Sequence, residues 1–115
     1  RLGLALAEFA MGRYEEAARV VQSDLIASPS LNRSSLSVRS AYRRQTDFDA
    51  HLRGLSQALA DQPDNLDYLL LAGFMQYFSG DKSGGLVNLE RYASSANADA
   101  RIVSFVRQLA ATANP

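Results

Sequence analysis

The feature that most constrains this chain is an internal repeat with a period of 34 residues. Pro29 and Pro63 lie 34 positions apart, and the segments that precede them align. A further step of 34 residues leads from Thr46 to Gly80, and the third copy ends at Asn97 in place of a proline. This period is typical of stacked helix hairpins, in which each unit buries its apolar face against its neighbours.

Each copy contains two stretches of helical periodicity on either side of a short turn. In the first copy, apolar side chains recur three or four residues apart before and after a turn at 11–13. This spacing gives a helix one apolar face. The second copy turns near Thr46 and ends at Pro63, because proline disfavours the helical conformation of the residue before it. The third copy turns at 79–81. We therefore predict three helix hairpins and no strand.

A final amphipathic stretch follows the third copy. Asp99 suits the first turn of a helix, where the helix dipole favours negative charge, and Ile102, Val106 and Leu109 share one side. Such a stretch is typical of the helix that caps a stack of repeats. We expect a single domain over residues 1–115 with seven helices. Its parts are repeats at about 1–31, 32–65 and 66–97, and a capping helix at about 99–113.

The second helix of the first copy resembles the tetratricopeptide repeat family. The family signature is a Gly-x-Tyr-x-x-Ala run followed by a proline twelve residues after the alanine. The matching residues here are Gly12, Tyr14, Ala17 and Pro29. The second copy departs from the signature at Thr46, Phe48 and His51 but keeps Ala58 and Pro63, and the third keeps Gly80. The resemblance covers residues 1 to about 97, although the tryptophan of the family's first helix is absent.

This resemblance implies an all-α fold in which antiparallel helix hairpins stack as a right-handed superhelical solenoid. It also implies that the first helix of each pair lines a concave groove. Carried over by register, the expected partner-binding residues are Leu36, Ser40, Arg43, Arg44, Leu70, Phe74 and Tyr77. The last three would be apolar anchors, and Arg43 or Arg44 would select an acidic neighbour.

Composition excludes several other classes. Twelve basic residues balance twelve acidic ones, so we expect no nucleic-acid partner. The absence of cysteine removes disulfides, thiol catalysis and cysteine-based zinc sites. The longest apolar run, from Tyr68 to Met75, is far shorter than the ~20 residues that cross a membrane. Because Arg1 lies within a helical pattern, we interpret the chain as a fragment of a longer protein, and its localisation is not predicted.

The residues that could carry chemistry favour structural roles. His51 has no partners at metal-ligand spacing, and paired carboxylates such as Glu15 and Glu16 suit a solvated helix start. The run from Ser79 to Gly85 lacks the spacing of a phosphate-binding loop. Glycine at Gly84 and Gly85 costs helix stability, which indicates a close approach of two helices. We expect no enzyme activity, cofactor or metal.

The charge distribution along the sequence is uneven at one place, a cluster of arginines at Arg33, Arg39, Arg43 and Arg44. These cations could bind an acidic peptide, or they could form a solvated helix face that pairs with Asp47 or Asp49. The aromatic run at 74–78 is either core or exposed for binding.

Two functional hypotheses follow, and both are protein interaction. The first is a scaffold that binds a peptide or protein segment in its concave groove. The second is self-association, of which a homodimer is one form, or packing within a larger multi-repeat protein. Leu2, Leu4 and Leu6 support the second, because a helix that is apolar almost all round requires a neighbour. An enzyme is the weakest alternative, because no nucleophile, metal cluster or phosphate cradle is present.

Overall fold

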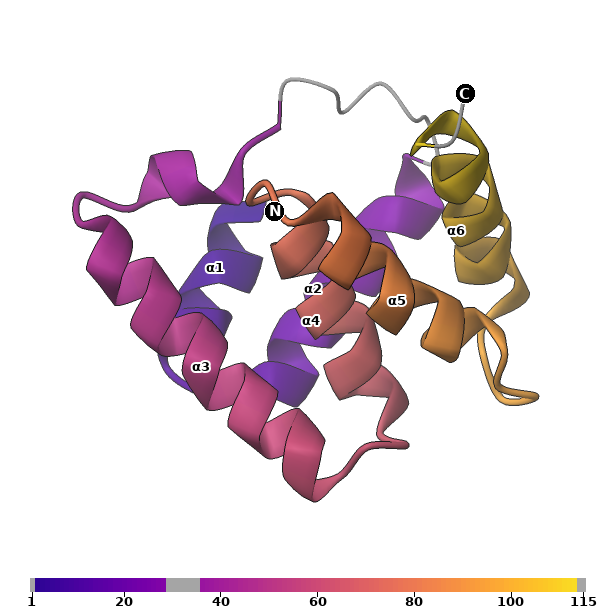
Figure 1. The fold of residues 1–115 in the computed structure, drawn as a ribbon, viewed down its shortest axis with the longest axis horizontal. Helices are drawn as coiled ribbons and strands as arrows, with labels where there is room; N and C mark the ends of the chain where they lie inside the picture. Colours follow the sequence, from indigo (N-terminus) through magenta and orange to yellow (C-terminus); the bar gives the residue numbers. More distant parts are fainter. Residues whose placement is uncertain (1, 29–35, 114–115) are drawn as a thin grey trace.

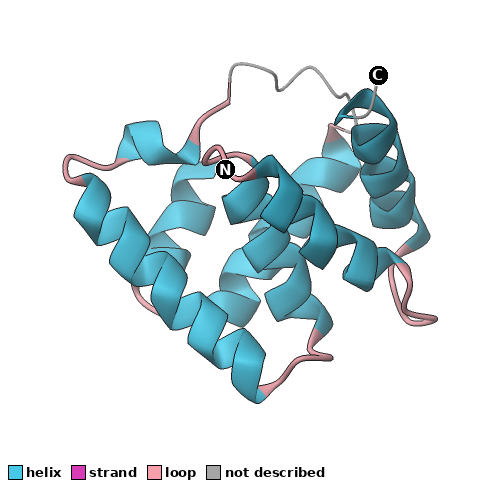
Figure 2. Ribbon diagram, in the orientation of Figure 1, coloured by secondary structure: helices cyan, strands magenta, loops and turns pink. Residues whose placement is uncertain are grey.

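The structure, a computed structural model, describes residues 2–28 and 36–113 and is helical throughout (Figure 1). Its elements are α1 (Leu2–Ala10), α2 (Tyr14–Ala27), the 3₁₀ helix η1 (Val38–Ala41), α3 (Gln45–Asp61), α4 (Leu66–Tyr77), α5 (Lys82–Ala93) and α6 (Ala100–Ala113). Within the described ranges there is no strand, as Figure 2 shows. The prediction of an all-α fold is confirmed.

Glycine makes the turn in the helix hairpins of the first and third copies of the repeat. Gly12, between α1 and α2, has a φ of 77°, and Gly80, between α4 and α5, has a φ of 112°. Glycine adopts these positive values without the steric cost that a side chain imposes. Both occupy one column of the 34-residue repeat, whose remaining member is Thr46. Thr46 lies inside α3, which begins at Gln45, so the second copy has no equivalent turn.

The segment before α3 departs from the predicted repeat. A helix was expected in the first half of the second copy, but the described part of that half contains only η1, between extended residues at Ser37 and Tyr42. The Val38 N–H donates a hydrogen bond to the Phe78 carbonyl (3.0 Å), and the Val38 side chain is fully buried. The prediction of seven helices is therefore wrong for the described residues, which form six α-helices. The helix start expected at 34–35 lies outside them.

Helix α4 is the centre of the molecule. It lies between α3 and α5 in Figure 1 and also contacts α2. Asn65 begins it as an N-cap, since its side-chain oxygen accepts a hydrogen bond from the Tyr68 N–H (3.1 Å). Its buried residues cover most of its circumference and are Leu69, Leu70, Leu71, Ala72, Gly73, Phe74, Met75 and Tyr77. A helix that is apolar on nearly all sides requires neighbours on several sides, and these three helices supply them.

The α4–α5 hairpin is closely packed through two glycines. A Cβ atom on Gly85 would lie 2.5 Å from the Tyr77 backbone nitrogen and 2.7 Å from the Gly73 carbonyl oxygen. A Cβ atom on Gly73 would lie 2.6 Å from Leu89 Cγ. The expected close approach is confirmed for Gly85. At Gly84 the nearest atoms belong to the Asp81 carboxylate, which caps α5 by accepting from the Gly84 N–H (3.0 Å).

The overall dimensions are those of a compact domain. The radius of gyration is 12.9 Å, and the extents are 32 × 31 × 24 Å. A compact chain of this length has a radius of gyration of about 13 Å. The superhelical stacking that the resemblance implies is not confirmed and stays a prediction.

Candidate interaction surfaces

Three of the seven expected partner-binding residues lie in the core. Leu70, Phe74 and Tyr77 are each 8% exposed or less, because three helices surround α4. The Phe74 and Tyr77 rings both contact the ring of Phe78, with centroid distances of 4.8 Å and 4.9 Å. The prediction that these three side chains line an open groove is wrong. They stabilise the fold and offer no surface to a partner.

The other four expected residues lie on the segment that leads into α3. Leu36 is half-buried against the core, whereas Ser40, Arg43 and Arg44 are exposed. Arg44 Nε lies 3.8 Å from Asp47 Oδ2, and an ion pair this exposed contributes little to stability. Because the α4 anchors are buried, the seven residues do not form one surface. Recognition of an acidic segment by Arg43 and Arg44 stays a prediction.

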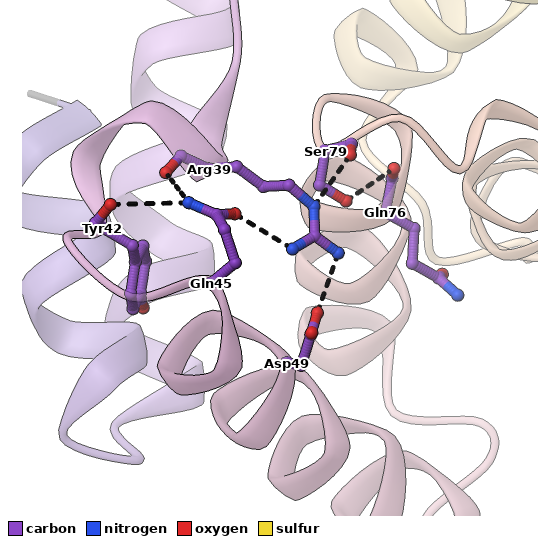
Figure 3. Close-up of polar contacts among 6 residues, drawn as sticks. All are labelled: Arg39, Tyr42, Gln45, Asp49, Gln76 and Ser79. Atoms are coloured by element: carbon purple, nitrogen blue, oxygen red, sulfur yellow. Dashed lines mark hydrogen bonds and ion pairs between the residues drawn. The ribbon is translucent and has the colours of Figure 1, made fainter.

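Arg39, from the same arginine cluster, has a structural role (Figure 3). Its guanidinium donates hydrogen bonds to the Ser79 carbonyl (3.0 Å), Gln45 Oε1 (3.1 Å) and Asp49 Oδ1 (2.8 Å). It also lies over the Phe48 ring, 4.6 Å from the centroid. One side chain thus joins η1 to α3 and to the end of α4, so pairing with Asp49 is the correct interpretation for this arginine.

His51 belongs to an aromatic cluster between α1 and α3. Its Nδ1 lies 2.9 Å from the Tyr42 hydroxyl, and its ring meets the Phe9 ring edge-on at 6.0 Å between centroids. Tyr42 and Phe9 also contact the buried ring of Phe48. These contacts engage Nδ1 and pack the ring against two aromatic neighbours, which supports the expected structural role.

The acidic residues at the start of α2 face the start of α4. Glu15 and Glu16 are exposed in the first turn of α2, where the helix dipole favours them. Asp67, in the first turn of α4, has a raised pKa, chiefly because burial disfavours its charged form. Arg19 lowers this pKa, whereas Glu15 and Glu16 raise it. The first turns of α2 and α4 lie near one another, which explains why these charged side chains influence the pKa of Asp67.

The outward side of α1 is an uncharged apolar surface, which we name the α1 face. Its residues are all exposed and are Gly3, Leu4, Ala7, Ala10 and Met11. At 3.6 residues per turn they cover an arc of about 120°. Leu4 is 56% exposed and Met11 61%. A surface helix normally places polar residues on this side, and α1 has none within the arc.

A second surface is the α4–α5 groove, an open groove of about 590 Å³ between the start of α4 and the end of α5. It is lined by Pro63, Asp64, Leu66, Leu69, Val87, Glu90, Arg91, Ser94 and Ser95. Val87 is 59% exposed, and Arg91 donates a hydrogen bond to the Pro63 carbonyl (2.9 Å). Leu4, Met11 and Val87 are the large apolar residues that are exposed in the part of the chain that the structure describes. Sequence periodicity pointed to Leu4 but not to Met11 or Val87.

Over residues 2–28 and 36–113, no three metal-binding side chains gather into a possible metal site. No helix in these ranges combines the length and apolar character that crossing a bilayer requires. Comparisons with protein-family models, with curated proteins and with solved structures found no match to this chain.

Proposed function

We propose that the chain is a protein–protein interaction module that assembles by packing the α1 face against an apolar helix. For the isolated chain, that helix is α1 of a second copy. The observation that carries the proposal is the uncharged arc of the α1 face, which holds Leu4 and Met11. The 34-residue repeat supports a further proposal, that the chain derives from tetratricopeptide-type hairpins and works as a unit of a longer helical stack.

The side chains of the α1 face suit helix packing. Gly3, Ala7 and Ala10 are small and allow a partner helix to approach to about 8–10 Å between axes. Leu4 and Met11 lie along one side of this small ridge and would leave water on contact. Complete burial of an exposed leucine or methionine contributes about 1.5–3 kcal/mol, and each is already partly buried, so each gains less than that. The expected contact between two copies is therefore weak and depends on concentration.

This proposal takes the place of peptide binding through the concave groove. The apolar anchors of that groove, Leu70, Phe74 and Tyr77, are buried. Self-association or packing within a larger assembly requires only the exposed side of α1. Both readings remain within the class of protein interaction, and the surface that carries the function is different.

Single cysteine variants test the proposal directly, because the chain contains no cysteine of its own. Ala7 lies near the middle of the α1 face, so Ala7→Cys should form disulfide-linked dimers under mild oxidation if two α1 helices meet there. The matched control is Ser83→Cys, at an exposed position of α5. Faster dimer formation by Ala7→Cys is the expected result. Equal rates for the two variants would count against the α1 face.

A further inference from the structure

We propose that the α4–α5 groove binds an extended segment of a partner protein in which a bulky aliphatic residue lies next to a lysine or arginine. The groove is separate from the α1 face, so this inference does not rest on the assembly proposed above.

The floor of the groove is apolar and built on rigid elements. Leu66 and Leu69 come from the first turn of α4, and Val87 comes from the middle of α5. Leu69 is buried, whereas Val87 is more than half exposed and has no apolar cover. The Arg91 guanidinium, bonded to the Pro63 carbonyl at 2.9 Å, ties the end of α5 to the turn before α4. The floor therefore exists before a ligand arrives, which lowers the ordering cost of binding.

The rim of the groove selects a cation. Asp64 and Glu90 are exposed, and neither forms an ion pair with any residue that the structure describes. Arg91 is the one cation among the lining residues, and its guanidinium is already bonded to the Pro63 carbonyl. The C-terminal end of α5 carries partial negative charge and the N-terminal end of α4 carries partial positive charge, so the two helix ends offset one another and the carboxylates decide the preference. The lining thus has two negative charges and one positive charge, and the arginine is held by its bond to Pro63. This balance favours binding of a basic side chain over an acidic one.

The polar residues at the end of α5 have backbone partners. The Ser94 hydroxyl donates to the Glu90 carbonyl (2.9 Å), and the Ser95 hydroxyl oxygen accepts from the Asn97 N–H (3.2 Å). Recognition thus depends on an aliphatic side chain over Leu66, Leu69 and Val87, with its neighbouring cation paired to Asp64 or Glu90. This arrangement suits a short linear segment, because the groove is open to solvent.

The test is an NMR titration of the isotope-labelled chain with two capped hexapeptides. One alternates leucine with lysine, and the other alternates leucine with glutamate. We expect the lysine peptide to shift the amide signals of residues 64–69 and 87–95 and to bind about threefold to tenfold more tightly than the glutamate peptide. This preference should weaken as salt is added. Equal binding of the two peptides, or shifts confined to other residues, would overturn the proposal, and so would the absence of any shift at millimolar peptide.

Two variants separate the apolar and charged contributions. Asp64→Lys combined with Glu90→Lys should reverse the preference, so that the glutamate peptide binds more tightly. Val87→Ala should weaken both peptides severalfold without altering the fold, because this side chain is largely exposed. Unchanged preference in the charge-reversal variant would contradict the role of the rim. Leu4→Glu with Met11→Glu disrupts the α1 face and should leave peptide binding unchanged, so failure of assembly and failure of the groove are distinguished.

Discussion

Gly85 on α5 faces Gly73 on α4 so closely that a Cβ atom on Gly85 would lie 2.7 Å from the Gly73 carbonyl oxygen. The contacting atoms are backbone, which cannot rotate away as a flexible side chain can. The hairpin that builds the α4–α5 groove therefore depends on the absence of a side chain at this position. The buried centre of the molecule depends on it as well, because α4 is the central helix.

Gly85→Ala should destabilise the protein by about 1–3 kcal/mol, because α5 must move away from α4 to admit one methyl group. This loss occurs although alanine has the higher helix propensity. Urea unfolding followed by circular dichroism measures it as a lower midpoint. Gly3→Ala is the matched control, since nothing lies within 4 Å of its added Cβ. That variant should be neutral or slightly more stable, and equal loss in both variants would contradict the account.

Arg39→Lys should destabilise the protein by about 1–2 kcal/mol. A lysine can neither reproduce the three guanidinium contacts with Ser79, Gln45 and Asp49 nor stack on Phe48 in the same way. Hydrogen exchange of the Val38 N–H, which bonds to the end of α4, should become faster.

Arg43→Lys is the control for that experiment, since Arg43 is exposed. Its stability should stay within about 0.5 kcal/mol of the wild type. A loss that is the same at both positions would show that Arg39 has no special role.

The stability of the start of α6 should depend on pH through Asp99. Hydrogen bonds from the Arg101 side chain and backbone lower the pKa of Asp99 to about 2. An unfolded aspartate has a pKa of about 3.9, so the folded state binds this proton less readily than the unfolded state does. The stabilisation is present above about pH 4 and is lost as the pH falls to about 2.

Asp99→Asn removes this titration. The difference in unfolding free energy between the wild type and the variant should therefore be largest near neutral pH and should shrink between about pH 4 and 2. Urea unfolding at a series of pH values measures it. A difference that is constant over this range would show that Asp99 titrates alike in the folded and unfolded states.

The first and third copies of the repeat follow the sequence prediction because local signals agree with tertiary packing there. Gly12 and Gly80 supply the turns, and Asn65 and Asp81 cap the helices that follow. The prediction of a helix hairpin is wrong for the second copy. Its glycine column holds Thr46, and Arg39 and Val38 make contacts with residues distant in sequence. Local periodicity carries no information on such contacts, which depend on the position of the end of α4.

The candidate sites were less predictable than the fold. Register along the repeat placed Phe74 and Tyr77 on a concave surface, but α4 contacts α2, α3 and α5 and buries both. The apolar run of this helix was compatible with burial, but the sequence did not indicate which helices would cover it. The exposure of Leu4 follows from a helix that is apolar all round, whereas Val87 is exposed at the α4–α5 groove, which its local pattern did not indicate.

The measurement that tests the central claim most directly is the mass of the chain in solution by light scattering over about a hundredfold range of concentration. If the α1 face is an assembly surface, the apparent mass should rise from 12.5 kDa toward twice that value. Leu4→Glu with Met11→Glu should stay at the monomer mass, whereas Val87→Glu, an equally exposed position on α5, should behave as the wild type. A wild-type chain that stays monomeric throughout, or a dimer that survives the Leu4 and Met11 changes, would contradict the claim.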